Sequence, residues 1–258
     1  MDLKLKAKTA LVTGSTAGIG LAIATALARE GATVIVNGRT QERVDAAMRT
    51  SGAAHGVAAD LATEGGVRAV IERLPSVDIL VNNVGIFEPK SFEEIPDADW
   101  RRLFEVNVLS GVRLSRHYIG GMKRNNWGRI VFISSESALQ IPVEMIHYGM
   151  TKTAQLAISR GLAETTIGTG VTVNAVLPGP TASEGVSDFV EKLAAEQGAD
   201  REAIEHEFFR TARPTSLLQR FTSPEEIADV VAFVCSPLAS AINGTAVRAE
   251  GGVVRSIA

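Results

Sequence analysis

Short runs of β-branched and apolar residues alternate along the chain with longer stretches of helical spacing. Such alternation predicts βαβ units, in which successive strands lie parallel and helices cover the sheet. The sequence therefore predicts an α/β fold. The expected strands are TALVT (9–13), ATVIV (32–36), HGVAA (55–59), VDILVNN (77–83), GRIVFIS (128–134), VTVNAVLP (171–178) and a short run near GTAVRAE (244–250).

One region departs from this alternation. Between residues 179 and 222, helical pieces intervene before SPEEIADVVAFV resumes the pattern. Insertions of this kind beside a parallel sheet often carry binding residues. No repeat or linker divides the chain. We expect a single domain over residues 1–258, with the insertion at about 180–222 acting as a substrate lid.

Composition narrows the class of protein. Hydrophobic residues make up 45% and charged residues 21% of the chain, which is typical of a globular protein. A formal charge of -3 and a pI near 5.9 predict binding neither to nucleic acid nor to an anionic membrane. The lone Cys235 cannot form an internal disulfide, and the first residues lack the features of a signal peptide, so we expect a cytoplasmic protein.

A glycine-rich turn lies between the first expected strand and helix. In TGSTAGIG (13–20), the glycines let the backbone approach a ligand, and the helix N-terminus offers amide groups to a phosphate. The alternative is a tight turn that needs glycine only for packing. In this context the motif favours nucleotide binding, with the contributing residues Gly14, Ser15, Thr16, Gly18, Ile19 and Gly20.

A tyrosine and a lysine lie four residues apart in HYGMTK. On a helix, Tyr148 and Lys152 would project from one face. A neighbouring positive charge favours the phenolate, so the pair could exchange protons near neutral pH. The alternative is an incidental pair on a surface helix. No histidines show metal-ligand spacing, and we expect no metal.

Taken together, the motifs TGSTAGIG, NNVG (82–85), Asn107, Ser135, YGMTK and PGPTAS (178–183) resemble the short-chain dehydrogenase/reductase family, including its 3-oxoacyl-carrier-protein reductase-like members. The resemblance covers nearly the whole chain in order. It implies a doubly wound, seven-stranded parallel Rossmann sheet flanked by helices, a nicotinamide cofactor and a small carbonyl or alcohol substrate. It also implies a homotetramer, with subunit contacts through the helices near 97–122 and 145–167 and near the C-terminal EGGVVRSIA. Helices that are apolar on two sides could equally be buried within one subunit.

The resemblance assigns catalysis to Asn107, Ser135, Tyr148 and Lys152. Tyr148 would deliver a proton to the carbonyl oxygen while Ser135 holds that oxygen through its hydroxyl. Lys152 would lower the pKa of Tyr148 and donate to the cofactor ribose. Asn107 would order a water that relays protons to Lys152.

Further cofactor contacts are expected at the ends of the strands. By the resemblance, Asn83 and Gly85 would form a backbone wall near the ribose. Asp60, with its neighbour Leu61, would contact adenine, although an aspartate here could equally cap the next helix. Other residues expected to meet the cofactor are Tyr148, Lys152, Pro178, Gly179, Thr181 and Ser183, of which Thr181 and Ser183 could contact its carboxamide or phosphates.

The turn after the second strand indicates which cofactor is used. An acidic residue there selects NAD, whereas arginine accommodates the 2'-phosphate of NADP. Gly38 and Arg39 occupy this turn, and no carboxylate appears until Glu42. We therefore expect NADP(H), the alternative being that Arg39 is only a solvated loop charge.

These observations predict an NADP(H)-dependent oxidoreductase of the carbonyl reductase type, which transfers a hydride between nicotinamide and a ketone or secondary alcohol. Two alternatives are an NAD-linked alcohol or sugar dehydrogenase and a nucleotide-sensing regulator on the same fold. The apolar face of VSDFVEKL and the nearby Phe208 could either line the substrate pocket or pack on the protein body. The roles of Glu136, Glu144 and His147 are left open.

Overall fold

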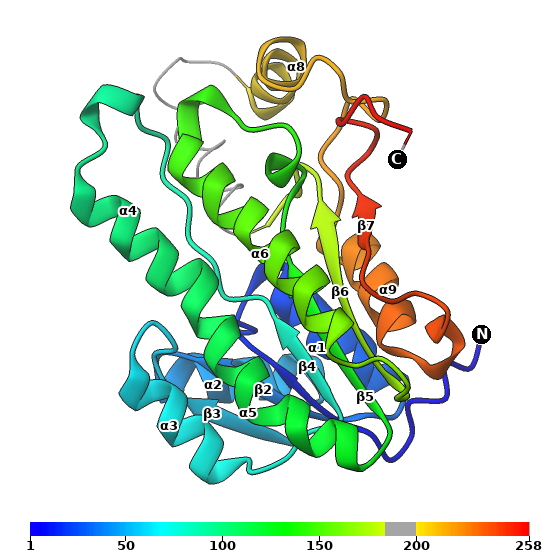
Figure 1. Ribbon diagram of the computed structural model, residues 1–258. Helices are drawn as coiled ribbons and strands as arrows, with labels where there is room; N and C mark the ends of the chain where they lie inside the picture. The colour runs from blue at the N-terminus through cyan, green and yellow to red at the C-terminus, as the bar shows by residue number, and fades with distance from the viewer. Residues whose placement is uncertain (184–199, 258) are drawn as a thin grey trace.

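Seven parallel strands form one sheet at the centre of the protein (Figure 1). The computed structural model describes residues 1–183 and 200–257. The strand order is β3-β2-β1-β4-β5-β6-β7, so the doubly wound, seven-stranded prediction is confirmed. The strands are β1 (Thr9–Val12), β2 (Thr33–Gly38), β3 (His55–Ala58), β4 (Ile79–Asn82), β5 (Gly128–Ile133), β6 (Val171–Pro178) and β7 (Ala246–Ala249).

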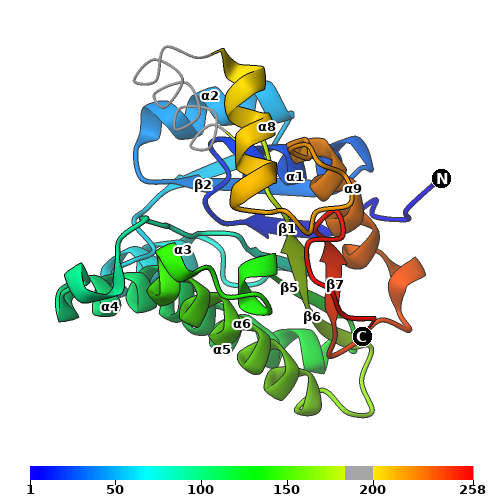
Figure 2. The same cartoon turned by 90° about the horizontal axis from the view of Figure 1, so that it is seen from above.

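Helices cover both faces of the sheet, as the view from above shows (Figure 2). One buried cluster joins the sheet to α1, α2 and α9, and a second joins it to α3, α5 and α6. The strands are buried on both sides and therefore consist mostly of apolar residues. The helices are α1 (Gly18–Arg29), α2 (Gln41–Ser51), α3 (Glu64–Arg73), α4 (Asp97–Phe104), α5 (Ser110–Arg124), α6 (Ile146–Glu164), α8 (Arg201–Thr211) and α9 (Pro224–Cys235).

Local sequence signals explain where several helices begin and end. Thr40 caps α2 by accepting from the amide of Arg43, and α2 ends at Gly52 in the left-handed conformation. A capping box between Ser223 and Glu226 starts α9. Between α4 and α5, one turn of π-helix spans Glu105–Leu109. Such a turn often marks a functional site.

The chain reverses its winding direction between β1 and β4. Ligands of doubly wound sheets bind outside the carboxyl ends of the strands at this switch point. Helix α8 lies above these strand ends (Figure 1). Part of the expected lid, including the apolar face of VSDFVEKL, lies outside the described residues. Among the helices that the structure describes, none combines the length and apolar character needed to cross a membrane.

Candidate active site

The glycine-rich turn is held in a conformation that other residues rarely adopt. Gly14 and Gly18 have φ angles of 58° and 53°. A Cβ atom on Gly20 would lie 2.4 Å from Nδ2 of Asn83, which itself donates to the carbonyls of Thr13 and Gly14. Asn83 therefore ties the end of β4 to the turn, and the absence of a side chain on Gly20 leaves room for this contact.

The start of α1 fits a bound phosphate. Its N-cap is Ala17, which provides no side-chain hydrogen bond to the first turn, so the helix offers amide groups without a side-chain cap. Ser15 is less available, because its hydroxyl donates to the carbonyl of Val12 and accepts from the amide of Asn37. Ser15 thus braces the turn against β2. The donor set suits the pyrophosphate of a dinucleotide.

The residues expected at the adenosine end follow the carboxyl ends of β2, which pairs with β1, and of β3, the edge strand beside β2. Arg39 is exposed and forms no ion pair with another described residue. Asp60 is also exposed, and its Oδ1 accepts from the amide of Ala62 at 3.0 Å. The cap of α3 is Thr63, so the helix-capping alternative for Asp60 is wrong. Leu61 is buried beside it.

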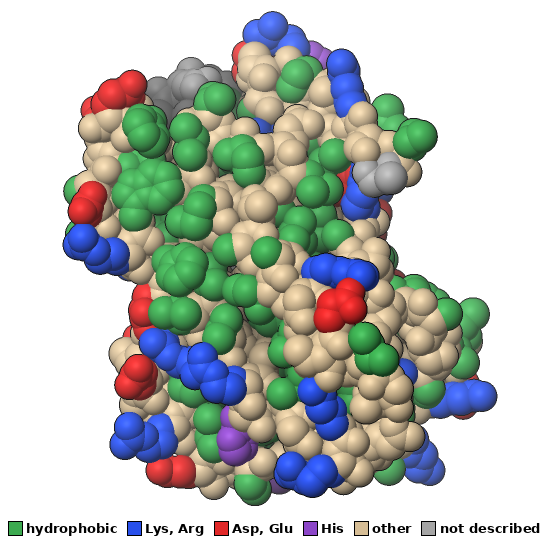
Figure 3. Space-filling view, in the orientation of Figure 1, with side chains coloured by type: hydrophobic (Ala, Val, Ile, Leu, Met, Phe, Trp, Pro, Cys, Tyr) green, Lys and Arg blue, Asp and Glu red, His purple; other side chains and the backbone are tan. Residues whose placement is uncertain are grey.

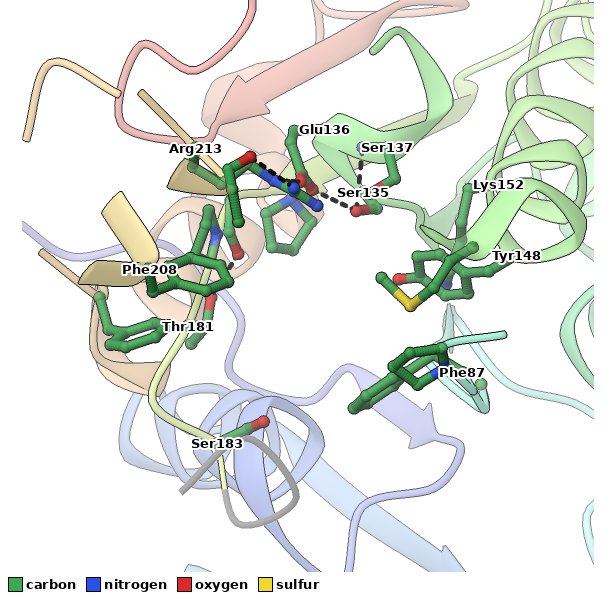
Figure 4. Close-up of a pocket in the computed structure, with 18 of the residues that line it drawn as sticks. Phe87, Ser135, Glu136, Ser137, Tyr148, Lys152, Thr181, Ser183, Phe208 and Arg213 are labelled. Atoms are coloured by element: carbon green, nitrogen blue, oxygen red, sulfur yellow. Dashed lines mark hydrogen bonds and ion pairs between the residues drawn. The ribbon is translucent and has the colours of Figure 1, made fainter. Parts of the chain in front are cut away.

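A cavity of about 600 Å³ opens at the carboxyl ends of the central strands. Figure 4 shows Tyr148 and Phe87 on one side of it and Phe208 on the other. Phe208 thus lines the cavity, while Phe209 is buried. The predicted site residues that line the cavity are Ile19, Asn83, Gly85, Ser135, Tyr148, Lys152, Pro178, Gly179, Thr181 and Ser183.

Tyr148 and Lys152 lie one turn apart on α6, as their spacing predicts. Lys152 Nζ lies 5.5 Å from the centre of the Tyr148 ring and donates to the carbonyl of Ile133 at 2.9 Å. The ring of Phe87 meets that of Tyr148 edge-on, with 6.2 Å between the centroids. The phenol therefore lies between a cation and an apolar wall.

Burial dominates the titration of this pair. It raises the pKa of Tyr148 above its ordinary value, and the charge of Glu136 raises it further, while the nearby Ser135 hydroxyl and the charge of Arg213 lower it. Burial also lowers the pKa of Lys152 to about 8, with Glu136 acting in the opposite direction. In the protein alone, burial is the largest influence on the pKa of Tyr148, and the expectation that Lys152 lowers this pKa stays a prediction.

The shifted lysine predicts a pH-dependent stability. An ordinary lysine titrates near pH 10.4, so between pH 8 and that value the unfolded chain binds more protons than the folded chain. The free energy of unfolding of the parent should therefore rise with pH, relative to Lys152→Met, by up to about 3 kcal/mol. Urea unfolding of both proteins at pH 7, 8, 9 and 10 measures the difference. A difference that stays constant over this range would contradict the assigned pKa.

The hydroxyl of Ser135 is held by its own neighbours. It donates to Oε2 of Glu136 at 2.5 Å and accepts from the amide of Ser137 at 3.1 Å. Oε1 of Glu136 accepts from Nε of Arg213 at 2.9 Å, and Nη1 of Arg213 lies 3.3 Å from Oε1 of Glu144. Glu136, left without a role by the sequence, is thus buried beside Ser135. Arg213 shows no signal in the sequence that would place it here.

Asn107 lies beneath the cavity, in the π-helical turn, and is 1% exposed. Its side chain accepts from the amide of Ile86 and donates both to the carbonyl of Ile86 and to Oγ1 of Thr151. Its main-chain carbonyl accepts from Nε2 of Gln155 at 2.6 Å. Asn107 therefore joins the loop after β4 to α6. Its expected role in a water relay stays a prediction.

The two hydroxyls after β6 differ in their surroundings. Thr181 is buried and its hydroxyl bonds to the carbonyl of Gly179 and the hydroxyl of Thr222. Ser183 is half-buried at the cavity wall.

His147, beside Tyr148, is fully buried with its ring 5.8 Å from Trp100, and burial lowers its pKa. Within residues 1–183 and 200–257, no cluster of potential ligands is placed to hold a metal ion.

The fold and the relatives of this chain define an oxidoreductase of a known class. A family model described as short chain dehydrogenase matches residues 8–194. The chain therefore belongs to the short-chain dehydrogenase/reductase family, as its motifs predict.

Named relatives extend this assignment. The chain is 51% identical over 263 residues to an uncharacterized oxidoreductase, YvaG, of Bacillus subtilis (strain 168), with both chains covered completely. It is 36% identical to the 3-oxoacyl-[acyl-carrier-protein] reductase FabG of Aquifex aeolicus, over 98% of this chain and 100% of that protein. Among solved structures, L-sorbose reductase from Gluconobacter frateurii, complexed with NADPH and L-sorbose, superimposes with a TM-score of 0.93 at 32% identity, with both chains fully covered.

Proposed function

We propose that the protein is an NADP(H)-dependent oxidoreductase that transfers a hydride between nicotinamide and a ketone or secondary alcohol, with Tyr148 as general acid and base. One observation carries the proposal: the hydroxyl-bearing residues Tyr148 and Ser135 line the same cavity as Ile19, which belongs to the helix after the glycine-rich turn. When bound, the nicotinamide supplies or accepts the hydride.

The residues of this chain would manage the proton. A phenol whose pKa lies above its ordinary value keeps its proton at neutral pH, which is the form that donates to a carbonyl oxygen. The Ser135 hydroxyl, at the same wall, would hold that oxygen after turning away from Glu136. Lys152 would bind the cofactor ribose, and its charge would stabilise the phenolate left after proton transfer.

The proposed preference for NADP(H) rests on Arg39. This side chain is exposed at the end of β2, without an ionic partner among the described residues, so it is available to a 2'-phosphate. The structurally similar L-sorbose reductase, which was solved with NADPH, also supports this cofactor preference.

The proposal predicts oxidation of NADPH in the presence of ketones. Purified protein is mixed with NADPH or NADH and a panel of ketones, keto esters and quinones, and absorbance at the nicotinamide band is followed. We expect turnover with at least one carbonyl compound, and faster with NADPH. If the protein binds NADPH but reduces none of them and oxidises no corresponding alcohol, the proposal of a carbonyl reductase fails and a nucleotide-sensing role gains support.

The proposed homotetramer also has a surface that suits it. Hydrophobic side chains gather over α4 and the neighbouring part of α6 (Figure 3). Val143 is 80% exposed, Phe92 56% and Phe104 38%. These lie on or beside the helices expected to form subunit contacts. The assembly and the cytoplasmic location stay predictions.

A further inference from the structure

Three residues from separate parts of the chain place an ion-pair network in the wall of the cavity. They are Glu136, just after β5, Glu144, just before α6, and Arg213, just after α8. The guanidinium lies between the two carboxylates, at 2.9 Å from Glu136 and 3.3 Å from Glu144 (Figure 4 shows the first of these pairs).

The guanidinium of Arg213 is largely occupied. Besides the two carboxylates, its Nη1 donates to the carbonyl of Ala212 at 2.8 Å. The Arg213 side chain is only 10% exposed and that of Glu136 only 6%. A carboxylate on a substrate would have to displace Glu144 from Arg213, or lie beside two carboxylates of the same charge. Both cost free energy, because like charges repel strongly where water is scarce.

The other charged residues of the cavity do not offset this. Glu207 adds a third carboxylate, which is paired with Arg210 at 2.7 Å. Lys152 is the second cation among the described lining residues, but it is 4% exposed and donates to the carbonyl of Ile133. Its charge lies 5.5 Å from the centre of the Tyr148 ring, where the proposed reaction uses it. A substrate that enters therefore meets bound cations and apolar walls.

We propose that Glu136, Arg213 and Glu144 are specificity-determining residues that make the cavity select uncharged ketones over keto acids. This rests on the proposed function, and it names the substrate class of that site. The network presents carboxylate oxygens to the cavity, while the guanidinium of Arg213 is already bonded to Glu136, Glu144 and the carbonyl of Ala212. An uncharged ketone avoids the repulsion and can still contact the apolar side chains of Phe87 and Phe208.

A matched pair of substrates tests this selectivity. Acetoacetamide and acetoacetate have nearly the same size and the same keto group, but only the second is an anion. We expect kcat/KM with NADPH to be at least about tenfold higher for the amide, since repulsion between charges a few ångströms apart exceeds the free energy of a tenfold ratio. Equal values, or a preference for the acid, would overturn the proposal.

Variants identify which residues cause the ratio of kcat/KM for acetoacetamide to that for acetoacetate. Glu144→Gln removes a half-exposed carboxylate and leaves Nη1 of Arg213 bonded only to the carbonyl of Ala212, so it should lower the amide-to-acid ratio severalfold. Glu136→Gln should lower it further, although it also changes a partner of Ser135. Glu202→Gln, the same change on the exposed first turn of α8, is the control and should leave the ratio unaltered. A Glu144→Gln protein that folds normally by circular dichroism but keeps the parental ratio would contradict the assignment.

Binding without turnover separates this inference from the proposed function. NADP⁺ cannot reduce a ketone, so titration calorimetry of the protein with NADP⁺ and each ligand measures affinity alone. Tighter binding of acetoacetamide without any turnover by NADPH or NADH supports the charge selectivity while the proposed function fails. Turnover of both compounds with equal affinities supports the function and overturns the selectivity. No measurable binding of the amide would also overturn it.

Discussion

Replacing Tyr148 with Phe is expected to lower turnover with any accepted ketone by at least about a hundredfold, because general acid catalysis typically contributes 10² to 10⁴. The ring packing against Phe87 would be retained, since only the hydroxyl is removed. NADPH binding should survive, so the loss would appear in kcat and little in the dissociation constant of the cofactor. Steady-state kinetics and a fluorescence titration with NADPH measure the two effects.

The chain contains a matched control for this variant. Tyr118, its other tyrosine, lies on α5 and away from the cavity. Its hydroxyl donates to the carbonyl of Leu74 at 2.8 Å. Tyr118→Phe should lower the free energy of unfolding by about 1 kcal/mol and leave kcat unchanged. If Tyr148→Phe retained near-normal ketone reduction, Tyr148 would have no role as the general acid.

Replacing Arg39 with Leu is expected to weaken NADPH binding by about ten- to more than a hundredfold. A charge-assisted hydrogen bond to a phosphate contributes about 1.5 to 3 kcal/mol, which corresponds to that range. NADH has no 2'-phosphate, so its kcat/KM should change little. The measurement is kcat/KM for both cofactors with one ketone. If the parent prefers NADH, or the variant alters neither cofactor, Arg39 is only a solvated turn residue.

A second arginine supplies the control for Arg39. Arg49 is exposed in the last turn of α2, at the opposite end of the helix that follows Arg39. Arg49→Leu removes the same charge and should leave both cofactors unaffected. An aspartate at position 38 is a less suitable test, because a Cβ atom there would lie 2.3 Å from Cγ2 of Thr16 and strain the glycine-rich turn.

The order and type of the strands and helices could be predicted from the sequence because their signals are local. Buried parallel strands require continuous apolar runs, and GRIVFIS and VTVNAVLP match β5 and β6 closely. The spacing of Tyr148 and Lys152 follows from helical geometry alone. The motif order then indicated the family.

The contacts of the site depended on tertiary structure. Glu136 and Arg213 are 77 residues apart in the chain, and no periodic pattern relates them. They meet because Glu136 follows the carboxyl end of β5 and the segment after α8 passes over the same end of the sheet. Asp60 shows the same limit, since local chemistry allows it to cap a helix, but the fold gives that position to Thr63.

By itself, the sequence determined the α/β architecture, the family and several of the side chains that line the cavity, such as Ser135, Tyr148 and Lys152, since these follow from periodicity and short motifs. Only the tertiary structure decided that Asn107 joins the loop after β4 to α6 and that Arg213 is held between two carboxylates. It also decided that burial raises the pKa of Tyr148. Burial and long-range ion pairing depend on all the surrounding segments at once, so no short stretch of sequence contains them.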